Sequence, residues 1–497
     1  MINKVLVANR GEIAVRVLRT CKELGQETVA VFSEADREAP HVRYADEAYC
    51  IGPPPAQKSY LQGDRIIQAA LEAGVQAIHP GYGFLAESPG FAQACNDAGL
   101  IFVGPRPETI ELLGNKAAAR RMARRLHLPI LPGTDRTLTD AELMSAAEQI
   151  DYPVLLKAAS GGGGVGIRTA HSREELEAAI PLARQEAEAS FGDGTLYLEQ
   201  LSVNARHIEV QLLADAHGHI IHLGEREWSI QRRHQKFIEE APSRALDPAL
   251  RRRILRAAVL IARAVRYVGA GTVEFLLDPK GKFYFLEVNP RLQVEHTVTE
   301  AITGVDIVKE QLRIAAGRKL RYTQKEIQPR GWALECRILA EDPFHNFAAC
   351  VGSISRLREP GGPGVRVDSG ICEGLTITPY YDSLLAKLIT WGETRAVAIV
   401  RMRRALEEYQ ILGVTTNLDL HRALMDSHRF FGGQFHTQFL EEQFVPLPTE
   451  EDDYLAAALT TVLLDWRKRV GARARAEVGV DRWKMLGRWQ LMGDDEQ

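Results

Sequence analysis

The 497-residue sequence has few cysteines, no surplus of basic residues and no long apolar run, and each absence excludes a class of protein. Its six cysteines lack CxxC spacing, which indicates reduced thiols rather than disulfides or a zinc site. With a net charge of −4, the chain lacks the broad positive field that nucleic-acid binding requires. No apolar run reaches the ~18 residues of a membrane span, and the first residues do not resemble a signal peptide. We therefore expect a cytoplasmic protein that binds neither nucleic acid nor membrane.

Two common nucleotide-binding motifs are also absent. The first βαβ pattern, with strands at 4–8 and 28–32 around a helix at 11–24, lacks the GxGxxG of dehydrogenases. The glycine-rich run at 160–166 is not a P-loop, because Lys157 precedes the glycines instead of following the last one. A dehydrogenase therefore remains only a weak alternative.

The composition is that of a globular protein, with 45% hydrophobic and 25% charged residues, and the length predicts two or three domains. Helices and strands alternate over the first ~110 residues, which predicts a doubly wound parallel α/β sheet. A helix is predicted at 113–125. Strand-like runs then dominate, with a helix at 249–265 between them, and the segment after 331 mixes strands with a helix at 395–409. These patterns indicate α/β and α+β units in one chain.

The most informative segment runs from Glu287 to His296 and alternates polar with apolar residues. In an extended chain successive side chains point to opposite faces, so Glu287, Asn289, Arg291 and the polar residues at 293 and 295 are predicted to share one face. An ordinary solvent-facing strand would alternate in the same way, and the pattern alone leaves that alternative open.

A predicted β-hairpin strengthens the functional interpretation. Residues 272–276 and 282–287 are predicted strands around the turn signal at 278–281, so Glu274 is expected near Glu287, although the register cannot be read from the sequence. Two carboxylates and the Asn289 amide are hard oxygen ligands that suit Mg²⁺ together with nucleotide phosphates.

Three further segments fit an anionic ligand. The glycine run offers backbone N–H groups that can close over phosphates, although a flexible hairpin tip would look the same. The strand ending near Leu201 could pair its backbone with an adenine edge, and His207, Glu209 and Gln211 are predicted on one strand face. The basic cluster at 231–236 is either an anion site or solvated surface.

At this point the motifs resemble one family, the biotin carboxylases of the ATP-grasp superfamily, from about residue 1 to about residue 440. The resemblance is carried, in order, by Ala8-Asn9-Arg10-Gly11-Glu12-Ile13-Ala14, His79-Pro80-Gly81-Tyr82-Gly83-Phe84, Gln231-Arg232-Arg233-His234-Gln235-Lys236, Glu287 through His296, and Glu335-Cys336-Arg337-Ile338. It implies an N-terminal Rossmann-like domain at 1–112, an ATP-grasp domain at 113–320 with a mobile lid at about 130–202, a C-terminal mixed α+β domain at 330–445, and a tail at 446–497.

The resemblance also implies the site. ATP would lie between the lid and the central domain, bicarbonate and the ring of biotin beside it, and one or two Mg²⁺ or Mn²⁺ ions would bridge the phosphates. The implied nucleotide, bicarbonate and biotin contacts are Lys116, Lys157, Gly163, Gly164, Glu199, Gln200, Leu201, His207, Gln231, His234, Tyr82, Gln293 and Val294; the implied metal ligands are Glu274, Glu287 and Asn289; and the implied catalytic residues are Lys236, Arg291, Glu295 and Arg337.

The implied reaction starts with Glu295 as the general base that deprotonates bicarbonate for attack on the γ-phosphate. The carboxyphosphate so formed would decompose to CO₂ and a phosphate that deprotonates biotin N1, while Arg337 stabilises the biotin enolate. Because two anions must meet, Lys236, Arg291 and the metal would offset their repulsion. Closure of the glycine loop would limit hydrolysis of carboxyphosphate.

Three positions depart from the family pattern. Val165 stands where Arg or Lys is usual in the glycine loop, Phe347-Ala348-Ala349-Cys350-Val351-Gly352 replaces a Phe-x-Pro-Ser-x-Gly pattern, and Ser202 stands where leucine is common. Because of Val165 and the tail, a non-catalytic regulatory subunit remains an alternative. Another ATP-grasp ligase, one that makes carbamoyl phosphate or a purine precursor, would share the nucleotide site but not the run at 287–296.

Partners follow from what the chain lacks. It has no Met-Lys-Met biotinylation site, and Lys484-Met485 lies too near the end for a carrier domain to surround it. We therefore expect biotin on a separate carboxyl carrier protein and a separate carboxyltransferase, with acetyl-CoA, propionyl-CoA or pyruvate as acceptor. A homodimer is implied, with Arg16, Arg19 and Glu23 on one helical stripe as candidate contacts, or as a solvated stripe. The tail, with Leu455, Leu459, Val462, Leu463 and Trp466 at helical spacing, is expected to dock a partner, or alternatively to pack on the protein's own body.

Overall fold

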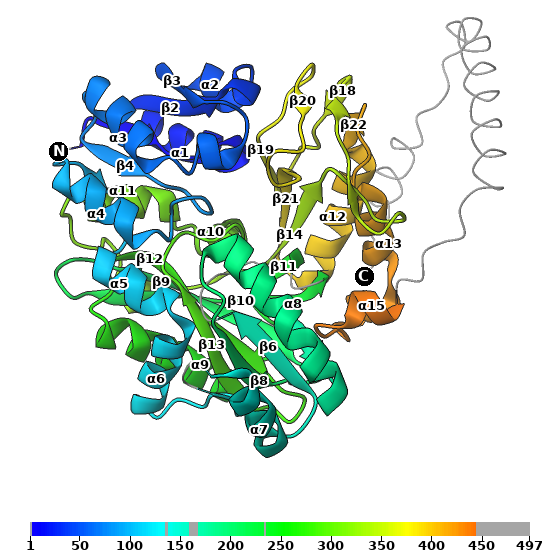
Figure 1. The fold of residues 1–497 in the computed structure, drawn as a ribbon. Coiled ribbons are helices and arrows are strands. Elements are labelled where there is room, and N and C mark those ends of the chain that lie inside the picture. Colours follow the sequence, from blue (N-terminus) through cyan, green and yellow to red (C-terminus); the bar gives the residue numbers. More distant parts are fainter. Residues whose placement is uncertain (1, 135–137, 159–166, 233–234, 444–497) are drawn as a thin grey trace, which may run out of the picture. The chain divides into compact units, whose positions relative to one another are not determined.

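A five-stranded parallel sheet in the order β3-β2-β1-β4-β5 forms the first part of the chain (Figure 1). The structure is a computed structural model, and it describes residues 2–134, 138–158, 167–232 and 235–443. The elements of this part are β1 (Lys4–Val7), α1 (Gly11–Glu23), β2 (Glu27–Ser33), α2 (Pro40–Tyr44), β3 (Glu47–Gly52), α3 (Gly63–Glu72), β4 (Ala77–His79), α4 (Pro89–Asp97), β5 (Ile101–Phe102), α5 (Pro107–Gly114) and α6 (Lys116–Arg125).

Side-chain alternation along β1 explains why helices cover both faces of this sheet. Val5 and Val7 belong to one buried cluster with α1 and α11 (Ile307–Ala315), whereas Leu6 and Ala8 belong to a second cluster with α3 and α4. A strand buried on both sides reads as a continuous apolar run, as it does here. The predicted doubly wound parallel sheet is therefore confirmed.

A second, eight-stranded sheet carries most of the polar cluster described below. All its neighbouring strands are antiparallel, in the order β13-β12-β9-β10-β11-β14-β21-β19. Its elements and their neighbours are β9 (Arg206–Ala214), β10 (Ile220–Arg232), β11 (Gln235–Ala241), α9 (Pro248–Ala264), β12 (Gly269–Leu277), β13 (Phe283–Asn289), α10 (His296–Thr303) and α11 (Ile307–Ala315).

The last part of the described chain extends this same sheet, because β14 pairs with β11. α12 packs on β14 and β21 and buries Met402 and Leu406 against them (Figure 1). The elements are β14 (Trp332–Leu339), β15 (Glu341–Asp342), β16 (Ala348–Ala349), β17 (Gly352–Ser353), β18 (Arg356–Arg358), β19 (Val365–Ser369), β20 (Thr376–Ile377), β21 (Leu384–Gly392), α12 (Arg395–Glu408), β22 (Gln410–Leu412), α13 (Leu418–Asp426), α14 (His428–Gly432) and α15 (Phe439–Gln443).

A small three-stranded antiparallel sheet, β7-β6-β8, lies between these parts in the sequence. Its elements are α7 (Asp140–Ile150), β6 (Val154–Ala158), β7 (Arg168–Ala170), α8 (Arg173–Phe191) and β8 (Leu196–Gln200). Leu143, Leu176 and Ile180 of the two helices pack on the buried strand β6. This segment therefore has its own apolar core, within the range that the sequence predicts as a lid.

The helices between residues 107 and 191 differ from the sequence prediction. α7 and α8, which pack on the small sheet, were not predicted, although a Thr139–Glu142 capping box was an available signal for α7. The predicted helix at 113–125 is also two helices, because the Asn115 side chain accepts the amide of Ala118 and starts a new helix there.

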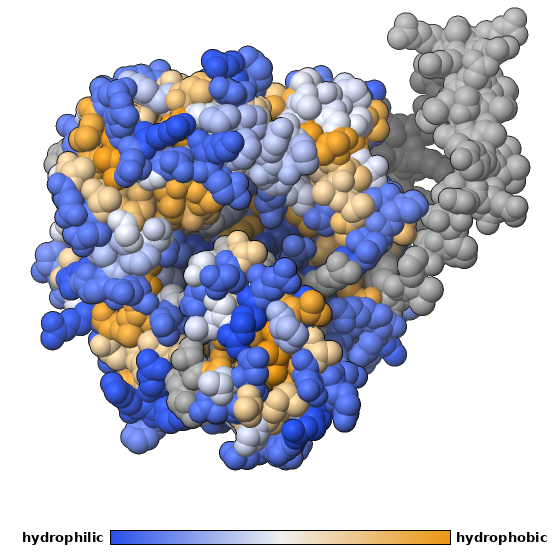
Figure 2. Space-filling model, in the orientation of Figure 1, coloured by the Kyte–Doolittle hydropathy of each residue, from blue (hydrophilic) through white to orange (hydrophobic). Residues whose placement is uncertain are grey.

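The surface is mostly hydrophilic on the face drawn in Figure 2, with scattered apolar patches and a hollow near its centre. No helix in the described ranges is long and apolar enough to cross a membrane. Predictions that concern Gly163, Gly164, Val165, His234 and the tail at 446–497 fall outside the described residues.

Three buried histidines predict acid sensitivity of the fold. Burial lowers the pKa of His41, His79 and His421 to about 4, below the ordinary value of 6.5. Between these two values the unfolded chain takes up protons that the folded chain does not, so stability falls as pH decreases through that window. At ~1.4 kcal/mol per pKa unit, each histidine contributes on the order of 1–3 kcal/mol. Buried carboxyls with a raised pKa, such as Glu239 and Glu274, change stability in the opposite direction, so the histidine contribution is measured as a difference between variants. In thermal unfolding scans from pH ~7 to ~5, the midpoint of His41→Leu should fall less, or rise more, than that of the wild type; parallel pH profiles of the two proteins would contradict this.

Candidate active site

The ammonium of Lys236 is the centre of a buried group of charges. Lys236 lies on β11, and its Nζ is 3.0 Å from Glu209 of β9, 3.2 Å from Glu274 of β12, and in direct contact with Glu295 at the start of α10. The centre of the Trp228 ring lies 4.1 Å from it. Although burial opposes it, the three carboxylates raise the pKa of Lys236, so this lysine is cationic.

Glu295 is held by cations on both of its oxygens. One oxygen contacts Lys236 and the other accepts from Arg337 Nη2 at 3.0 Å, and the carboxylate is fully buried. Burial opposes ionisation, but these two cations hold the pKa of Glu295 well below its usual range. Arg337 also donates to Glu239 at 2.6 Å, and burial raises the pKa of Glu239 to about 8.

The β12–β13 hairpin places the two proposed metal carboxylates side by side. Glu274 and Glu287 are register partners, and Asn289 Nδ2 donates to Glu274 Oε1 at 2.8 Å. Burial and the charge of Glu287 raise the pKa of Glu274 to about 8 in spite of Lys236. A divalent cation would relieve this crowding, so the residues fit one. In the described ranges, no three His, Cys, Asp or Glu side chains could hold a metal together, so phosphate oxygens would complete the shell.

The strand predicted from Glu287 onward ends earlier than expected. β13 stops at Asn289, because Pro290 has no N–H to continue the ladder, and Glu295 occupies the N-cap of α10. The expectation of one continuous strand face to residue 295 was therefore wrong, since backbone pairing ends before the pattern does.

The polar side chains of this run nevertheless meet. Arg291 donates to Gln293 Oε1 at 3.1 Å and to Asn289 Oδ1 at 3.3 Å, and Gln293 donates to Glu274 Oε1 at 3.3 Å. Arg291 is also 3.3 Å from Glu87, in the loop between β4 and α4. These groups therefore gather as the pattern predicts, although the backbone that gathers them after Asn289 is a turn.

Nucleotide-side candidates form two further ion pairs. Lys116, at the start of α6, is 3.2 Å from Glu287, and Lys157, near the end of β6, contacts the buried Glu199. Although burial opposes it, Lys157 holds the pKa of Glu199 below its usual value. A bound polyphosphate would compete with both carboxylates for these lysines.

The remaining nucleotide candidates differ in what they can offer a ligand. His207 lies against Trp228 with ring centroids 3.9 Å apart, and the buried Gln231 leaves its Oε1 without a hydrogen bond in the described structure. Gln200 and Leu201 do not offer free amides, because their N–H groups donate to Pro132 O at 2.8 Å and Pro153 O at 2.9 Å. In this conformation an adenine ring nitrogen would need another backbone N–H as its hydrogen-bond donor.

Arg226 is a functional candidate that sequence reasoning missed. Its fully buried guanidinium donates to Glu209 at 2.5 Å, Gln211 at 2.6 Å, Thr299 at 3.0 Å and Thr272 at 3.1 Å. It therefore fixes the carboxylate that in turn fixes Lys236. No local signal singled it out, because Arg226 stands between two other charged residues, Glu225 and Glu227.

Three other predicted residues do not contact the Lys236 ammonium in the described structure. The Tyr82 hydroxyl donates to Glu12 of α1, and the Val294 carbonyl accepts from Lys387 at 2.8 Å. Arg16 does not share an exposed stripe with Arg19 and Glu23, so that prediction was wrong. Its guanidinium is buried because it pairs with Glu300 and Asp306, both at 2.9 Å.

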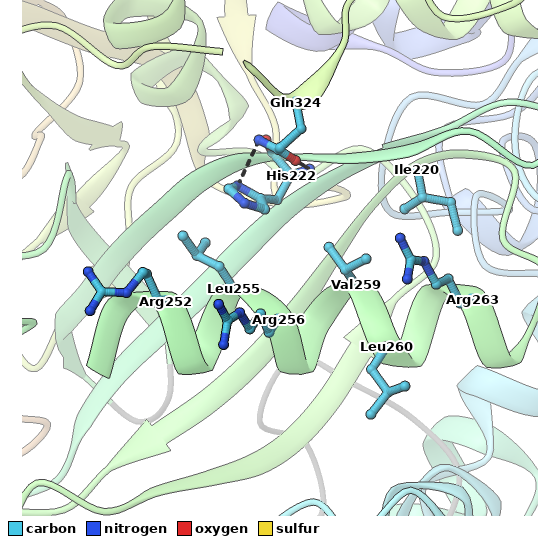
Figure 3. Close-up of a pocket in the computed structure, with 9 residues that line it drawn as sticks. All are labelled: Ile220, His222, Arg252, Leu255, Arg256, Val259, Leu260, Arg263 and Gln324. Carbon is cyan, nitrogen blue, oxygen red and sulfur yellow. Dashed lines mark hydrogen bonds between the residues drawn. The ribbon is translucent and has the colours of Figure 1, made fainter. Parts of the chain in front are cut away.

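A hollow between α9 and the start of β10 contains none of these residues. It encloses about 490 Å³ and is lined along α9 by Arg252, Arg256 and Arg263, with His222 and Gln324 opposite (Figure 3). Gln324 donates to His222 O at 3.0 Å and closes its edge. No member of the Lys236 cluster lines it, so we place the chemistry at Lys236 and not in this hollow.

Comparison with known proteins assigns the family. Residues 1–110 match the family model "Biotin carboxylase, N-terminal domain", 115–323 match "Carbamoyl-phosphate synthase L chain, ATP binding domain", and 335–442 match "Biotin carboxylase C-terminal domain". Biotin carboxylase 1 of Bacillus subtilis is 50% identical over 89% of this chain and 98% of that protein, and the biotin carboxylase of a Nostoc species is 51% identical over 88% and 99%.

A solved structure agrees with this assignment. The biotin carboxylase domain dimer of Hydrogenobacter thermophilus 2-oxoglutarate carboxylase, in complex with MgADP, ADP and bicarbonate, is 51% identical, covers 89% of this chain and 98% of that one, and has a TM-score of 0.87. The chain belongs to the biotin carboxylase family of ATP-grasp enzymes. Its activity is the ATP-dependent carboxylation of biotin.

The Arg226 contacts predict a loss of rate without loss of nucleotide binding. Arg226→Lys keeps the charge but cannot reach all four acceptors, so Glu209 and Lys236 lose their fixed geometry. We expect turnover to fall by about 10²-fold, as for a misplaced catalytic group. Steady-state kinetics would measure this, and Arg256→Lys, on the outer face of α9, is the matched control. Equal rates in the two variants would remove Arg226 from the site.

Proposed function

We propose that this site carboxylates biotin carried on a separate protein, with Lys236, Arg291 and Arg337 assembling the anions and Glu295 as the base. The observation that carries the proposal is that Glu295 forms ion pairs with two cations, Lys236 and Arg337. A buried carboxylate between two cations is an ion pair that an anionic substrate can open, because the substrate competes for the same cations.

Bicarbonate binding would activate the base. While Lys236 and Arg337 are bound to Glu295, its pKa is too low for efficient proton transfer. If bicarbonate draws the ammonium of Lys236 to itself, Glu295 loses one cation and its pKa rises toward a useful range. Glu295 would then take the proton of bicarbonate, and a bicarbonate oxygen would attack the γ-phosphorus as the bond to ADP breaks.

The phosphate end is proposed to lie against Lys116, Lys157 and the Glu274–Glu287 pair. One or two divalent cations would supply charge neutralisation at the phosphates when bound. Lys116 and Lys157 each pair with a carboxylate that phosphate can replace. The residues Gly163, Gly164 and His234 are proposed to complete this contact on the strength of the resemblance alone.

Biotin is proposed to bind near Arg337 and Tyr82. Carboxyphosphate decomposes to CO₂ and phosphate, the phosphate accepts the N1 proton of biotin, and Arg337 stabilises the negative charge that develops on the ureido oxygen. N1 then attacks the carbon of CO₂, and the new N–C bond gives carboxybiotin. The guanidinium is held at 2.6 Å from Glu239 and 3.0 Å from Glu295, so it is fixed before biotin arrives.

The final carboxyl acceptor and the protein partners are proposed from the relatives and the sequence, and not from the geometry of the site. Relatives of similar identity are named for pyruvate, 2-oxoglutarate and propionyl-CoA carboxylation, so the acceptor is proposed to be chosen by a carboxyltransferase and not by this chain. We propose a carrier protein as partner, a homodimer with Arg19 and Glu23 at its contact, a cytoplasmic location, and the domain boundaries given by the sequence. The tail at 446–497 is proposed to dock a partner.

The overall proposal is tested by ATP cleavage in the purified protein. Cleavage should require bicarbonate and should rise when free biotin is added. Another ATP-grasp ligase would not respond to biotin, and a regulatory protein without catalytic activity would cleave no ATP.

Glu295 and Arg337 can be told apart by their place in the reaction. Removing one well-placed electrostatic group costs ~10²–10³ in rate, so Glu295→Gln and Arg337→Ser should both nearly abolish biotin carboxylation. Glu295→Gln should also suppress bicarbonate-dependent ATP cleavage, whereas Arg337→Ser should retain much of it. Phosphate release and carboxybiotin are measured in parallel. The assignment of roles fails if Arg337→Ser stops both equally, or if Glu295→Gln leaves ATP cleavage unchanged.

If Glu274 and Glu287 bind the metal, variants of either residue should need a higher Mg²⁺ concentration. Glu274→Gln and Glu287→Gln each replace a charged oxygen ligand with a neutral one, so each variant should need more Mg²⁺ for half-maximal rate and reach a lower maximum. Rates are measured over a Mg²⁺ titration at saturating ATP, with Glu72→Gln, on the surface of α3, as control. An unchanged metal dependence in both variants would take this pair out of the metal site.

A further inference from the structure

Lys387 is a buried lysine in the middle of an apolar strand. It lies on β21 in the sequence Leu-Leu-Ala-Lys-Leu-Ile, and its side chain has no solvent exposure. Lysines are almost never fully buried unless their charge is paired. Its ammonium lies 3.3 Å from Glu12 Oε1 and donates to the carbonyl of Val294 at 2.8 Å, with Asp368 4.0 Å away.

These partners come from three distant parts of the sequence. Glu12 lies in the first turn of α1, Val294 lies in the turn between β13 and α10, and Lys387 belongs to β21, next to the edge strand β19 of the large sheet. Directly after β19 the backbone approaches the start of α1 so closely that it requires glycine. A Cβ at Gly370 would lie 2.4 Å from the backbone N of Glu12. Lys387 therefore ties the N-terminal part, the central part and the last part of the described chain at one point.

Glu12 extends this contact to Tyr82. The Tyr82 hydroxyl donates to the same Glu12 oxygen that faces Lys387, and the centre of the Tyr82 ring lies 5.9 Å from the Lys387 ammonium. The Tyr82 backbone is also fixed, because Asn9 Nδ2 donates to the carbonyls of Tyr82 and Pro80, both at 2.7 Å. Burial raises the pKa of Glu12 to about 7, and the charge of Lys387 opposes that rise.

The Val294 end of the contact bears directly on the base. Val294 immediately precedes Glu295, so a hydrogen bond to the Val294 carbonyl fixes the orientation of the peptide that joins them. Glu295 makes no side-chain capping bond on α10, so the helix end does not orient its carboxylate. The Lys387 hydrogen bond therefore acts on the backbone from which the base projects.

We propose that Lys387 is a positioning residue that couples the biotin side of the site, through Glu12 and Tyr82, to the bicarbonate side, through the Val294–Glu295 peptide. This inference rests on the proposed roles of Tyr82 and Glu295. Misplacing a reacting group by about 1 Å costs up to ~10²-fold in rate. The contacts of Lys387 to Glu12 and to the Val294 carbonyl therefore matter most for the carboxylation of biotin, in which biotin and the bicarbonate-derived carboxyl group must be aligned.

The test compares biotin and ATP kinetics in matched variants. Lys387→Met keeps much of the length of the side chain but removes its donor and charge, and pairing it with Glu12→Gln avoids leaving a buried carboxylate without a partner. We expect kcat/KM for biotin to fall about 10- to 100-fold in Lys387→Met and in the pair, with KM for ATP within about twofold of wild type. Lys387→Arg, which keeps a cationic donor, should recover part of the loss.

A double-mutant cycle of Lys387→Met with Tyr82→Phe distinguishes coupling between these two residues from simple destabilisation of the fold. If Lys387 and Tyr82 act through one chain of contacts, Tyr82→Phe combined with Lys387→Met should be no slower with biotin than Lys387→Met alone. Multiplicative effects, or equal losses in the ATP and biotin parameters, would overturn the inference. Wild-type protein that fails to carboxylate biotin would instead refute the proposed function, so the two failures are distinguishable.

Discussion

The ion pairs of one buried ammonium organise this site. Lys236 sits between Glu209, Glu274 and Glu295, which arrive from two strands and a helix start that are far apart in the sequence. Removing one partner of a buried pair leaves an uncompensated charge, at a cost of about 3–5 kcal/mol, whereas the complete set is tolerated. The strand order β12-β9-β10-β11 brings these groups to one place, so the large sheet is the scaffold of the chemistry.

The same pairing explains how a site for anions can exist without its substrates. Lys116, Lys157, Lys236 and Arg337 each have a carboxylate partner in this structure. Substrate phosphates and bicarbonate are also anions and can exchange with these carboxylates. Each exchange leaves a cation satisfied and changes the pKa of the carboxylate it leaves. In the proposed mechanism, proton transfer and substrate binding are coupled by charge in this way, and Arg226 and Lys387 are proposed to fix the positions of the exchanging groups.

The parallel sheet of the N-terminal part and the Glu274–Glu287 hairpin could be predicted from the sequence, because both depend on local signals, namely apolar runs and turn residues. The family motifs supplied candidate roles that spacing could not. Lys236 meets Glu209 and Glu274 through β-sheet pairing over 27 and 38 residues, and such long-range register is not written in a local pattern. Arg226 and Lys387 were missed for the same reason, because a charged residue within a strand gains meaning only from partners that are distant in the sequence.

The most direct test of the role of the Lys236 cluster follows the oxygen atoms of bicarbonate. In the proposed mechanism, the cations around Glu295 assemble the reactants so that a bicarbonate oxygen attacks the γ-phosphorus and stays with the phosphate when carboxyphosphate breaks down. With bicarbonate labelled with heavy oxygen and turnover in the presence of biotin, mass spectrometry should find one labelled oxygen in each inorganic phosphate released. Unlabelled phosphate would mean that water cleaves ATP, and it would contradict the central role given to the Lys236 cluster.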